Sequence, residues 1–368
     1  MIVESLIKIG VILGILVVAF APILLWMERR QSAVIQDRLG PILANAGRWR
    51  FFGFLHPLAD AIKFIWKEDF VPAKADKLLH ALGPLVAFIP ALVTFAVVPF
   101  GDVLCTQDLG EVVGAFGQCL EGHRTVNLQI ADLDVGILYL FAVAGTGVIG
   151  AAIAGYASNN KYALLGGLRA ASQMVSYEVT MGLAIVGCLM IFGTVQLGDM
   201  VRWQIDHVWG IAVQPVAFIL FFAAAVAETK RVPFDLPEGE SEIVAGYFLE
   251  YSGMKFGMFF MAEFVELVVL SAVLTTLFLG GWHVPFLGPD GFHFGDTYLS
   301  LAHGVVAALQ IGGFWIKVFL LCWVQQMVRW TLPRFRYDQV MRLGWIYLLP
   351  LSLANIVVTG LVMLAMEG

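Results

Sequence analysis

LDVGILYLFAVAGTGVIGAAIAGY, residues 133–156, holds one charged side chain, Asp134, in 24 residues. A hydrocarbon core about 30 Å thick is spanned by about 20 apolar residues of helix. In lipid every backbone amide and carbonyl needs an internal partner, and a helix supplies one for each. The stretch therefore predicts a helix that crosses a membrane.

The same criterion predicts about eight transmembrane helices. Their approximate ranges are 5–27, 79–100, 133–156, 173–193, 211–227, 256–281, 302–328 and 346–366. Composition agrees, because 60% of the 368 residues are hydrophobic and only 14% are charged. Soluble domains carry about 45–50% apolar and about 25% charged residues. We expect an all-α integral membrane protein in a lipid bilayer, with residues 1–368 forming a single polytopic membrane domain.

Basic residues indicate the orientation of these helices. Eighteen of the 22 Lys and Arg residues fall in four alternate loops, at 28–78, 157–172, 228–255 and 329–345. Because Lys and Arg concentrate in cytoplasmic loops, these loops are predicted to be inner and both termini outer, in a bacterial plasma (inner) membrane. The net charge of −6 excludes nucleic acid as a partner, since no basic excess exists to neutralise phosphates.

The four cysteines are scattered. Cys105 and Cys119 fall in the second loop, on the predicted outer side, where a bacterium permits disulfides. Sequence does not supply disulfide geometry, so the bonded and the free state both stay open. Cys188 and Cys322 lie in predicted spans and are expected to be buried. Without a Cys-x-x-Cys motif, paired span histidines or a Gly-rich nucleotide fingerprint, we expect this chain to bind no metal and no redox cofactor.

The first inner loop contains an amphipathic segment at about 54–70. Its apolar stripe is Leu55, Leu58, Ala59, Ile62, Ile65 and Trp66. Its polar stripe is Asp60, Lys63 and Lys67. The pattern predicts a helix lying in the inner membrane interface. A surface helix packed on another cytoplasmic protein is the alternative, and the two are compatible.

Several carboxylates fall inside predicted spans. Glu178 is in the fourth span, Glu228 ends the fifth, and Glu263 and Glu266 share one face of the sixth. Charges inside a membrane are costly and usually mark ion or proton pathways. Pairing with a buried lysine is the simpler explanation, but Lys317 is one candidate for four acids. The set therefore favours a proton path.

The third inner loop, about 228–254, is unusually acidic. Within AETKRVPFDLPEGESE, residues 227–242, the carboxylates are Asp235, Glu238, Glu240 and Glu242, beside Glu228. Two prolines forbid a continuous helix, so the segment must turn. A solvated acidic loop is one interpretation. Interspersed apolar residues such as Phe234 favour the other, a partly buried loop beside the membrane acids.

Five blocks of this sequence resemble one family in the same order. They are MERRQSAVIQDRLGP at 27–41, HPLADAIKFIWKED at 56–69, NNKYALLGGLRAASQMVSYEV at 159–179, AETKRVPFDLPEGESEIVAGYFLEYSGM at 227–254 and LPRFRYDQVMRLGWIYLLPLSLAN at 332–355. The chain is thereby similar to the H subunit, or subunit one, of NADH:quinone oxidoreductase (respiratory complex I). The resemblance covers essentially the whole chain, and the family also has eight helices.

The resemblance implies a function in an assembly. Family members form the membrane end of the quinone chamber, and quinone is the substrate. They contact peripheral-arm subunits, which carry FMN and iron–sulfur clusters, and begin an acidic path toward antiporter-like membrane subunits. The expected function is that of a quinone-chamber subunit of a proton-pumping enzyme, inactive by itself.

The resemblance also implies roles for particular residues. The acidic path would comprise Glu178, Glu228, Glu238, Glu240, Glu242 and Glu263. The quinone chamber would comprise Arg29, Arg38, Asp60 and Phe234. Arg334 and Arg336 would support the chamber or the docking surface.

Three positions depart from the family's usual pattern. His56 stands in place of Gln, Lys230 in place of Asn, and Glu266 is an additional acid. His56 is either a titrating group near the chamber or an exposed interfacial side chain. Three other functions remain open: a membrane subunit of a proton-translocating hydrogenase or formate hydrogenlyase, a stand-alone proton-coupled transporter, and a structural connector. A transporter would be expected to show two halves with matching broken helices, which the sequence lacks.

Overall fold

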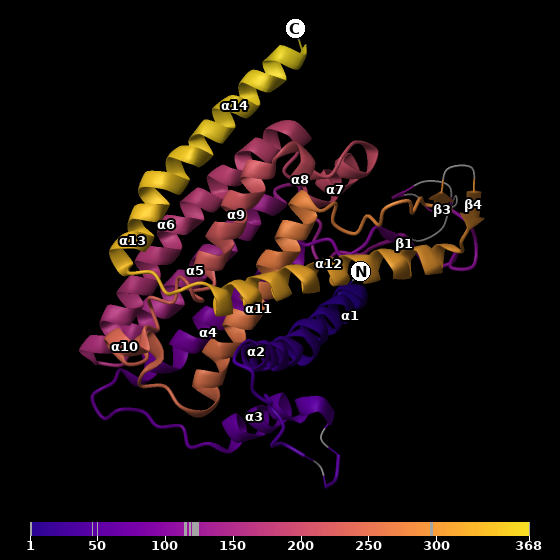
Figure 1. Ribbon diagram of the computed structural model, residues 1–368. Coiled ribbons are helices and arrows are strands. Elements are labelled where there is room, and N and C mark those ends of the chain that lie inside the picture. Colours follow the sequence, from indigo (N-terminus) through magenta and orange to yellow (C-terminus); the bar gives the residue numbers. More distant parts are fainter. Residues whose placement is uncertain are drawn as a thin grey trace.

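The computed structural model describes residues 2–45, 47–49, 51–113, 116–117, 119, 125–294 and 297–367. In this part the chain is a bundle of long helices with two small hairpins near one end (Figure 1). The long helices are α1 (Ile2–Leu13), continued through the π-helical Gly14–Phe20 into α2 (Ala21–Ile35), α4 (Lys77–Thr94), α5 (Gly136–Ala157), α6 (Lys161–Phe192), α9 (Pro215–Glu228), α11 (Gly253–Phe278), α12 (His303–Thr331), and α13 (Tyr337–Arg342), continued through the π-helical Leu343–Leu348 into α14 (Leu349–Glu367).

Shorter elements connect these helices. They are α3 (Leu55–Trp66), α7 (Leu197–Asp206), α8 (Gly210–Val213), α10 (Glu240–Ile243), the 3-10 turns Phe51–Gly53, Phe95–Val97 and Gly246–Phe248, and the strands β1 (Val103–Cys105), β2 (Thr125–Asn127), β3 (Gly291–Phe294) and β4 (Thr297–Ser300). The strands pair as two antiparallel hairpins, β1 with β2 and β3 with β4. Figure 1 places α3 and α10 at one end of the bundle and α7 and α8 at the other.

The all-α membrane class is confirmed, with one difference in helix length. Seven helices in the described part are long and apolar enough to cross a membrane. The counterpart of the expected span 211–227 is α9, which has only 14 residues. At 1.5 Å per residue it is about 21 Å long, short of a core about 30 Å thick. The helix is interrupted at Gln214 because a residue that precedes a proline is disfavoured in the helical region.

Helices also extend further than hydropathy predicts at the α3–α10 end. The loop expected at 157–172 is mostly helix, because α6 begins at Lys161. Asn160 starts α6 by accepting a hydrogen bond from the Tyr162 amide. Arg169 then lies on a helix and pairs with Glu242 at 2.6 Å. Because polar side chains before the apolar span have partners within the protein, the helix extends beyond the span.

α11 is the most buried of the candidate spans. It contacts α2, α3, α4, α9 and α12, and Phe264, Val268 and Leu274 lie in the core. α4, α5 and α6 approach one another through small residues. A Cβ added to Gly150 of α5 would lie 2.5 Å from the backbone nitrogen of Ala87 in α4. Small residues of this kind allow membrane helices to pack closely.

The amphipathic segment predicted at 54–70 forms α3, which ends at Trp66. Of its polar stripe, Asp60 pairs with Arg29 of α2, whereas Lys63 and Lys67 are exposed. Phe64 packs against Phe256 of α11. Leu58, Ile62 and Trp66 on the apolar stripe stay exposed. The helix is confirmed, and its place in the membrane interface stays a prediction.

Cys105 and Cys119 form a disulfide, with Cα atoms 5.6 Å apart. The Cys105 amide also donates to Nε2 of His303 at the start of α12, at 3.0 Å. The first hairpin is thereby attached to the bundle. Cys188 and Cys322 are fully buried, as expected.

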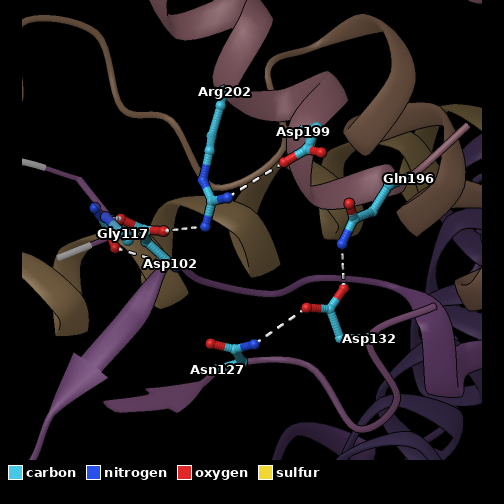
Figure 2. Close-up of polar contacts among 8 residues, drawn as sticks. Asp102, Gly117, Asn127, Asp132, Gln196, Asp199 and Arg202 are labelled. Carbon is cyan, nitrogen blue, oxygen red and sulfur yellow. Dashed lines mark hydrogen bonds and ion pairs between the residues drawn. The ribbon is translucent and has the colours of Figure 1, made fainter. Parts of the chain in front are cut away.

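Arg202 of α7 fastens the same region (Figure 2). Its guanidinium reaches Asp102 at 3.4 Å and Asp199 at 3.2 Å. Asp102 precedes β1 and accepts from the Gly117 amide at 2.7 Å. Figure 2 also shows Asp132 accepting from Asn127 and Gln196. These polar contacts hold the loops of the α7 end to one another.

Replacing both Cys105 and Cys119 with alanine should loosen the α7 end. Closing a loop of about 15 residues stabilises a fold by about 3 kcal/mol, so proteolytic cleavage of this loop should accelerate in the variant. A non-reducing digest should also yield the two cysteine peptides linked in the parent chain. Rapid alkylation of Cys105 and Cys119 in the folded chain, while buried Cys188 stays protected, would contradict the bond.

Candidate functional site

Glu228, the last residue of α9, is the most enclosed carboxylate of the predicted set. Its exposed fraction is 3%, and its Oε2 makes no hydrogen bond to the described residues. A buried carboxylate without a full set of partners is costly and therefore calls for a chemical role. Glu266 and Glu178 are the nearby acids that act on it electrostatically, together with Lys230.

Glu228 lines a partly open cavity among the helices. Residues of α4, α5, α6, α9 and α11 line it. Three acids from three helices meet there: Glu178, Glu228 and Glu266. Glu178 lies against α5, because a Cβ added to Gly145 would be 2.9 Å from its Oε1. The structure thus brings together two acids of the predicted path, with Glu266 rather than Glu263 as the third in the cavity lining.

The cation in this cavity is Lys230. Its Nζ lies 3.5 Å from Oε2 of Glu266. Burial by itself would lower the pKa of Lys230, but Glu266, Glu263, Glu228 and Glu238 around it raise the pKa above its usual value. The ammonium is therefore held charged by the acids. Lys230 and Glu266 thus form one ion pair.

Lys317, the lysine considered as a partner for the acids, lies elsewhere. Its Nζ donates to the carbonyls of Leu279, Gly281 and His283 at 2.6–3.0 Å. It also lies 4.6 Å from the ring centroid of Trp209. These carbonyls follow the end of α11, where helix carbonyls lack internal partners and a cation is favourable. The interpretation that Lys317 pairs with the membrane acids is therefore wrong. Lys317 instead supports the end of α11.

Beside the cavity, Glu238 of the acidic loop meets Glu263 of α11. The side chains of the two acids interact electrostatically. Burial raises the pKa of Glu238 well above its ordinary value, and the charge of Glu263 raises it further. Two carboxyl groups in contact share a proton more readily than both ionise. Glu263 is 6% exposed, and Glu238 is partly buried.

Asp235 forms the other buried contact of the loop. Its Oδ2 accepts from Arg334 at 2.6 Å. Burial raises the pKa of Asp235 to about 6, although the Arg334 guanidinium opposes the shift. The loop is held inside the bundle by Gln173 of α6, whose Nε2 donates to the carbonyls of Ala227 and Phe234, both at 2.8 Å. The partly buried interpretation of the acidic loop is thus confirmed for this segment.

The remaining loop acids differ from Glu238. Glu242 is at the surface, 46% exposed, in its pair with Arg169. The side chain of Glu240 lies outside the described part of the structure. Within the described part, Glu238 is therefore the member of the predicted loop trio that reaches the interior acids.

The predicted chamber residues make the following contacts. Arg29 and Asp60 are together, with Nη2 and Oδ2 2.5 Å apart, and join α2 to α3. Arg38 donates to Ser32 at 2.9 Å. Phe234 is buried in the core, packed between the rings of Tyr177 and Phe335.

Arg336 and His56 contact residues outside the predicted acidic path. The Arg336 side chain is 78% exposed and pairs with Asp338 at 3.3 Å. His56 accepts hydrogen bonds from the Leu43 and Ala44 amides at 3.1 and 3.2 Å. Its ring holds a loop in place, a role that neither interpretation of His56 anticipated.

Glu28, directly after the first predicted span, is a buried contact residue that sequence reasoning did not single out. Its Oε2 accepts from Arg231 at 3.0 Å, and its Oε1 lies 2.9 Å from Nη1 of Arg329. Arg231 also lies over the ring of Phe264 at 4.2 Å. Glu28 thus ties α2 to the acidic loop and α12. Its neighbours Arg29 and Arg30 made it look like an ordinary interfacial charge.

The chain matches the family model described as NADH dehydrogenase over residues 7–360. It is 46% identical to H subunit 1 of the NADH-quinone oxidoreductase of Geobacter metallireducens, covering 95% of this chain and 93% of the relative. It is 42% identical to H subunit 1 of the same enzyme from Cytophaga hutchinsonii, covering 91% and 90%, and 41% identical to H subunit 2 from Koribacter versatilis, covering 97% and 96%.

The chain belongs to the family of NADH-quinone oxidoreductase H subunits. It is thus a multi-pass membrane subunit of an oxidoreductase complex, complex I, whose other subunits are its partners. The resemblance read from the five sequence blocks is confirmed. A stand-alone transporter is not supported.

In this H-subunit family member, replacing Glu28 with glutamine should destabilise the fold. Arg231 and Arg329 would keep their charges without a carboxylate between them, at a cost of about 3–5 kcal/mol for a broken buried ion pair. The thermal midpoint of the purified complex should fall. Asp338→Asn is the matched control, because its pair with Arg336 is exposed and such pairs contribute about 1 kcal/mol or less. Equal thermal midpoints for Glu28→Gln and Asp338→Asn would contradict a stabilising role of the Glu28 ion pairs.

Asp235→Asn should change how stability depends on pH. The pKa of Asp235 is about 6 in the folded chain against an ordinary 3.8, so the folded state binds the proton more tightly. Its stabilising contribution is complete below about pH 4 and is lost as the pH rises through about 6. The stability of the parent relative to Asp235→Asn should therefore fall between these values. Thermal midpoints of both chains across pH 4–7 test this, and a constant difference would exclude it.

Proposed function

We propose that the chain is the quinone-chamber subunit of a proton-pumping NADH:quinone oxidoreductase, and that its buried carboxylates couple quinone reduction to proton translocation. The observation that carries the proposal is that Glu178, Glu228 and Glu266 line one cavity, where Oε2 of Glu228 has no hydrogen-bond partner among the described residues. The names of the relatives support the oxidoreductase and the quinone.

The chemistry of quinone reduction suits this arrangement. A quinone takes up two electrons and two protons, and negative charge on its headgroup is stabilised by nearby cations such as Arg29. That charge perturbs carboxylates linked to it. Asp235, Glu238 and Glu263 act on one another electrostatically, and Glu263 also acts on Lys230 and Glu266. The change in charge would pass along this series to Glu228 and Glu178.

The partners follow from the same proposal. Electrons would arrive from peripheral-arm subunits that carry FMN and iron–sulfur clusters, while this chain would hold no redox cofactor. The arm would dock at the α3–α10 end, where Arg38, Arg336 and Glu242 are exposed. Antiporter-like membrane subunits would receive the protons. In a bacterial inner membrane this end would face the cytoplasm, with both termini outside.

The first test isolates the native complex through a tag on this chain in mild detergent. NADH oxidation is then measured with added quinone, with and without a quinone-site inhibitor. Inhibitor-sensitive NADH:quinone activity is expected. A complex that oxidises hydrogen or formate, and not NADH, would instead assign the chain to the homologous hydrogenase or formate hydrogenlyase branch.

Glu228→Gln should lower inhibitor-sensitive activity at least tenfold in the assembled complex, because glutamine keeps the shape of the side chain and cannot carry a proton. Asp206→Asn is the control. That acid is exposed on α7, at the opposite end of the bundle from α10 (Figure 1). An unchanged rate and proton stoichiometry in Glu228→Gln would refute the coupling role, and would favour a subunit that only connects its neighbours.

A further inference from the structure

Lys230 occupies an unusual position for a lysine. Its φ is +54°, in the left-handed region that side-chain-bearing residues rarely adopt. It follows the last turn of α9, and only 8% of the residue is exposed. Both the backbone conformation and the burial of an ammonium are unfavourable by themselves. We therefore look to the contacts of the ammonium for the reason that a lysine occupies this position.

Those contacts leave the ammonium incompletely satisfied. It carries three N–H donors. Its contacts in the described part are Glu266 Oε2 at 3.5 Å and the Met174 sulfur, a weak acceptor, at 3.9 Å. On the same cavity, Oε2 of Glu228 lacks a hydrogen bond to those residues. A donor short of acceptors and an acceptor short of donors thus share one cavity.

We propose that Lys230 is a positioning residue for proton transfer, whose ammonium pairs alternately with the carboxylates of Glu266 and Glu228. When it pairs with Glu266, that carboxyl is ionised and Glu228 carries the proton. When the proton passes through the cavity to Glu266, the ammonium moves to the ionised Glu228. One ammonium, one carboxylate and one carboxylic acid exist before and after the step, so the net charge of the three groups stays at zero.

The other charged groups around Lys230 fit this role. Glu263 and Glu238 act on Lys230 electrostatically from α11 and the acidic loop, and Glu178 acts on Glu228 from α6. Tyr247 lines the same cavity from the 3-10 turn Gly246–Phe248. They set how readily the ammonium leaves Glu266. The inference rests on the proposed function, since it concerns the path that contains Glu228.

The test uses Lys230→Met, Glu266→Gln and the double variant in the assembled complex. We expect each single variant to lower the inhibitor-sensitive NADH:quinone rate at least fivefold, to leave the KM for quinone within twofold, and to move the pH optimum by about one unit. The double variant should stay impaired, because Glu228 still lacks its counter-ion. A merely structural ion pair predicts the opposite, a double variant with the parent's rate and pH profile, and that result would overturn the proposal.

Two further measurements keep the outcomes separate. If Lys230→Met fails to assemble, Glu266→Gln decides alone, because it retains the lysine; a parent-like rate and pH profile would then refute alternation. Glu228→Gln is measured in parallel. If Glu228→Gln is impaired and the Lys230 and Glu266 variants are not, the alternation fails while the proposed function stands. If Glu228→Gln is itself parent-like, the proposed function fails and the alternation fails with it.

Discussion

The structure depends on one constraint, that a charge taken into the interior of this bundle must meet an opposite charge or share a proton. Glu28 shows the first solution. Its two oxygens contact two guanidiniums, Arg231 from the acidic loop and Arg329 from α12. Desolvation of three charges is costly, and their mutual attraction offsets it only because the geometry is close. That contact, with the Gln173 amide, holds a proline-rich polar segment among apolar helices.

The acids around the cavity show the second solution. The charge of Glu263 acts on Glu238, which disfavours ionisation of both acids together, and Glu266 is offset by Lys230. The interior is therefore compensated partly by fixed cations and partly by protons. A cation such as Arg231 cannot leave, whereas a proton can. Acids paired with fixed cations belong to the part of the site that supports the fold, and acids that carry protons belong to the part that can change charge.

Sequence reasoning predicted the broad features because they rest on local composition. The spans follow from apolar runs, and α3 follows from the stripe that includes Leu58 and Ile62. The acids Glu178 and Glu228 were found because a carboxylate in an apolar run stands out. Pairings between distant segments could not be found in this way. Glu28 and Arg329 are 301 positions apart and both looked interfacial, and Lys317 looked like a partner for the acids until its three carbonyl contacts placed it elsewhere.

The Glu28 contact also has a consequence for biosynthesis. Glu28 emerges from the ribosome early, Arg231 about two hundred residues later and Arg329 about a hundred after that. At a translation rate of about 5–20 residues per second, the interval between Glu28 and Arg329 is about 15–60 s. During that time α2 can contact α3, but its partners in α11 and α12 and the two arginines that pair with Glu28 are not all present. The Glu28 contact can therefore be completed only after α12 has been made, although α4, α5 and α6, which are neighbours in the chain, can pack earlier.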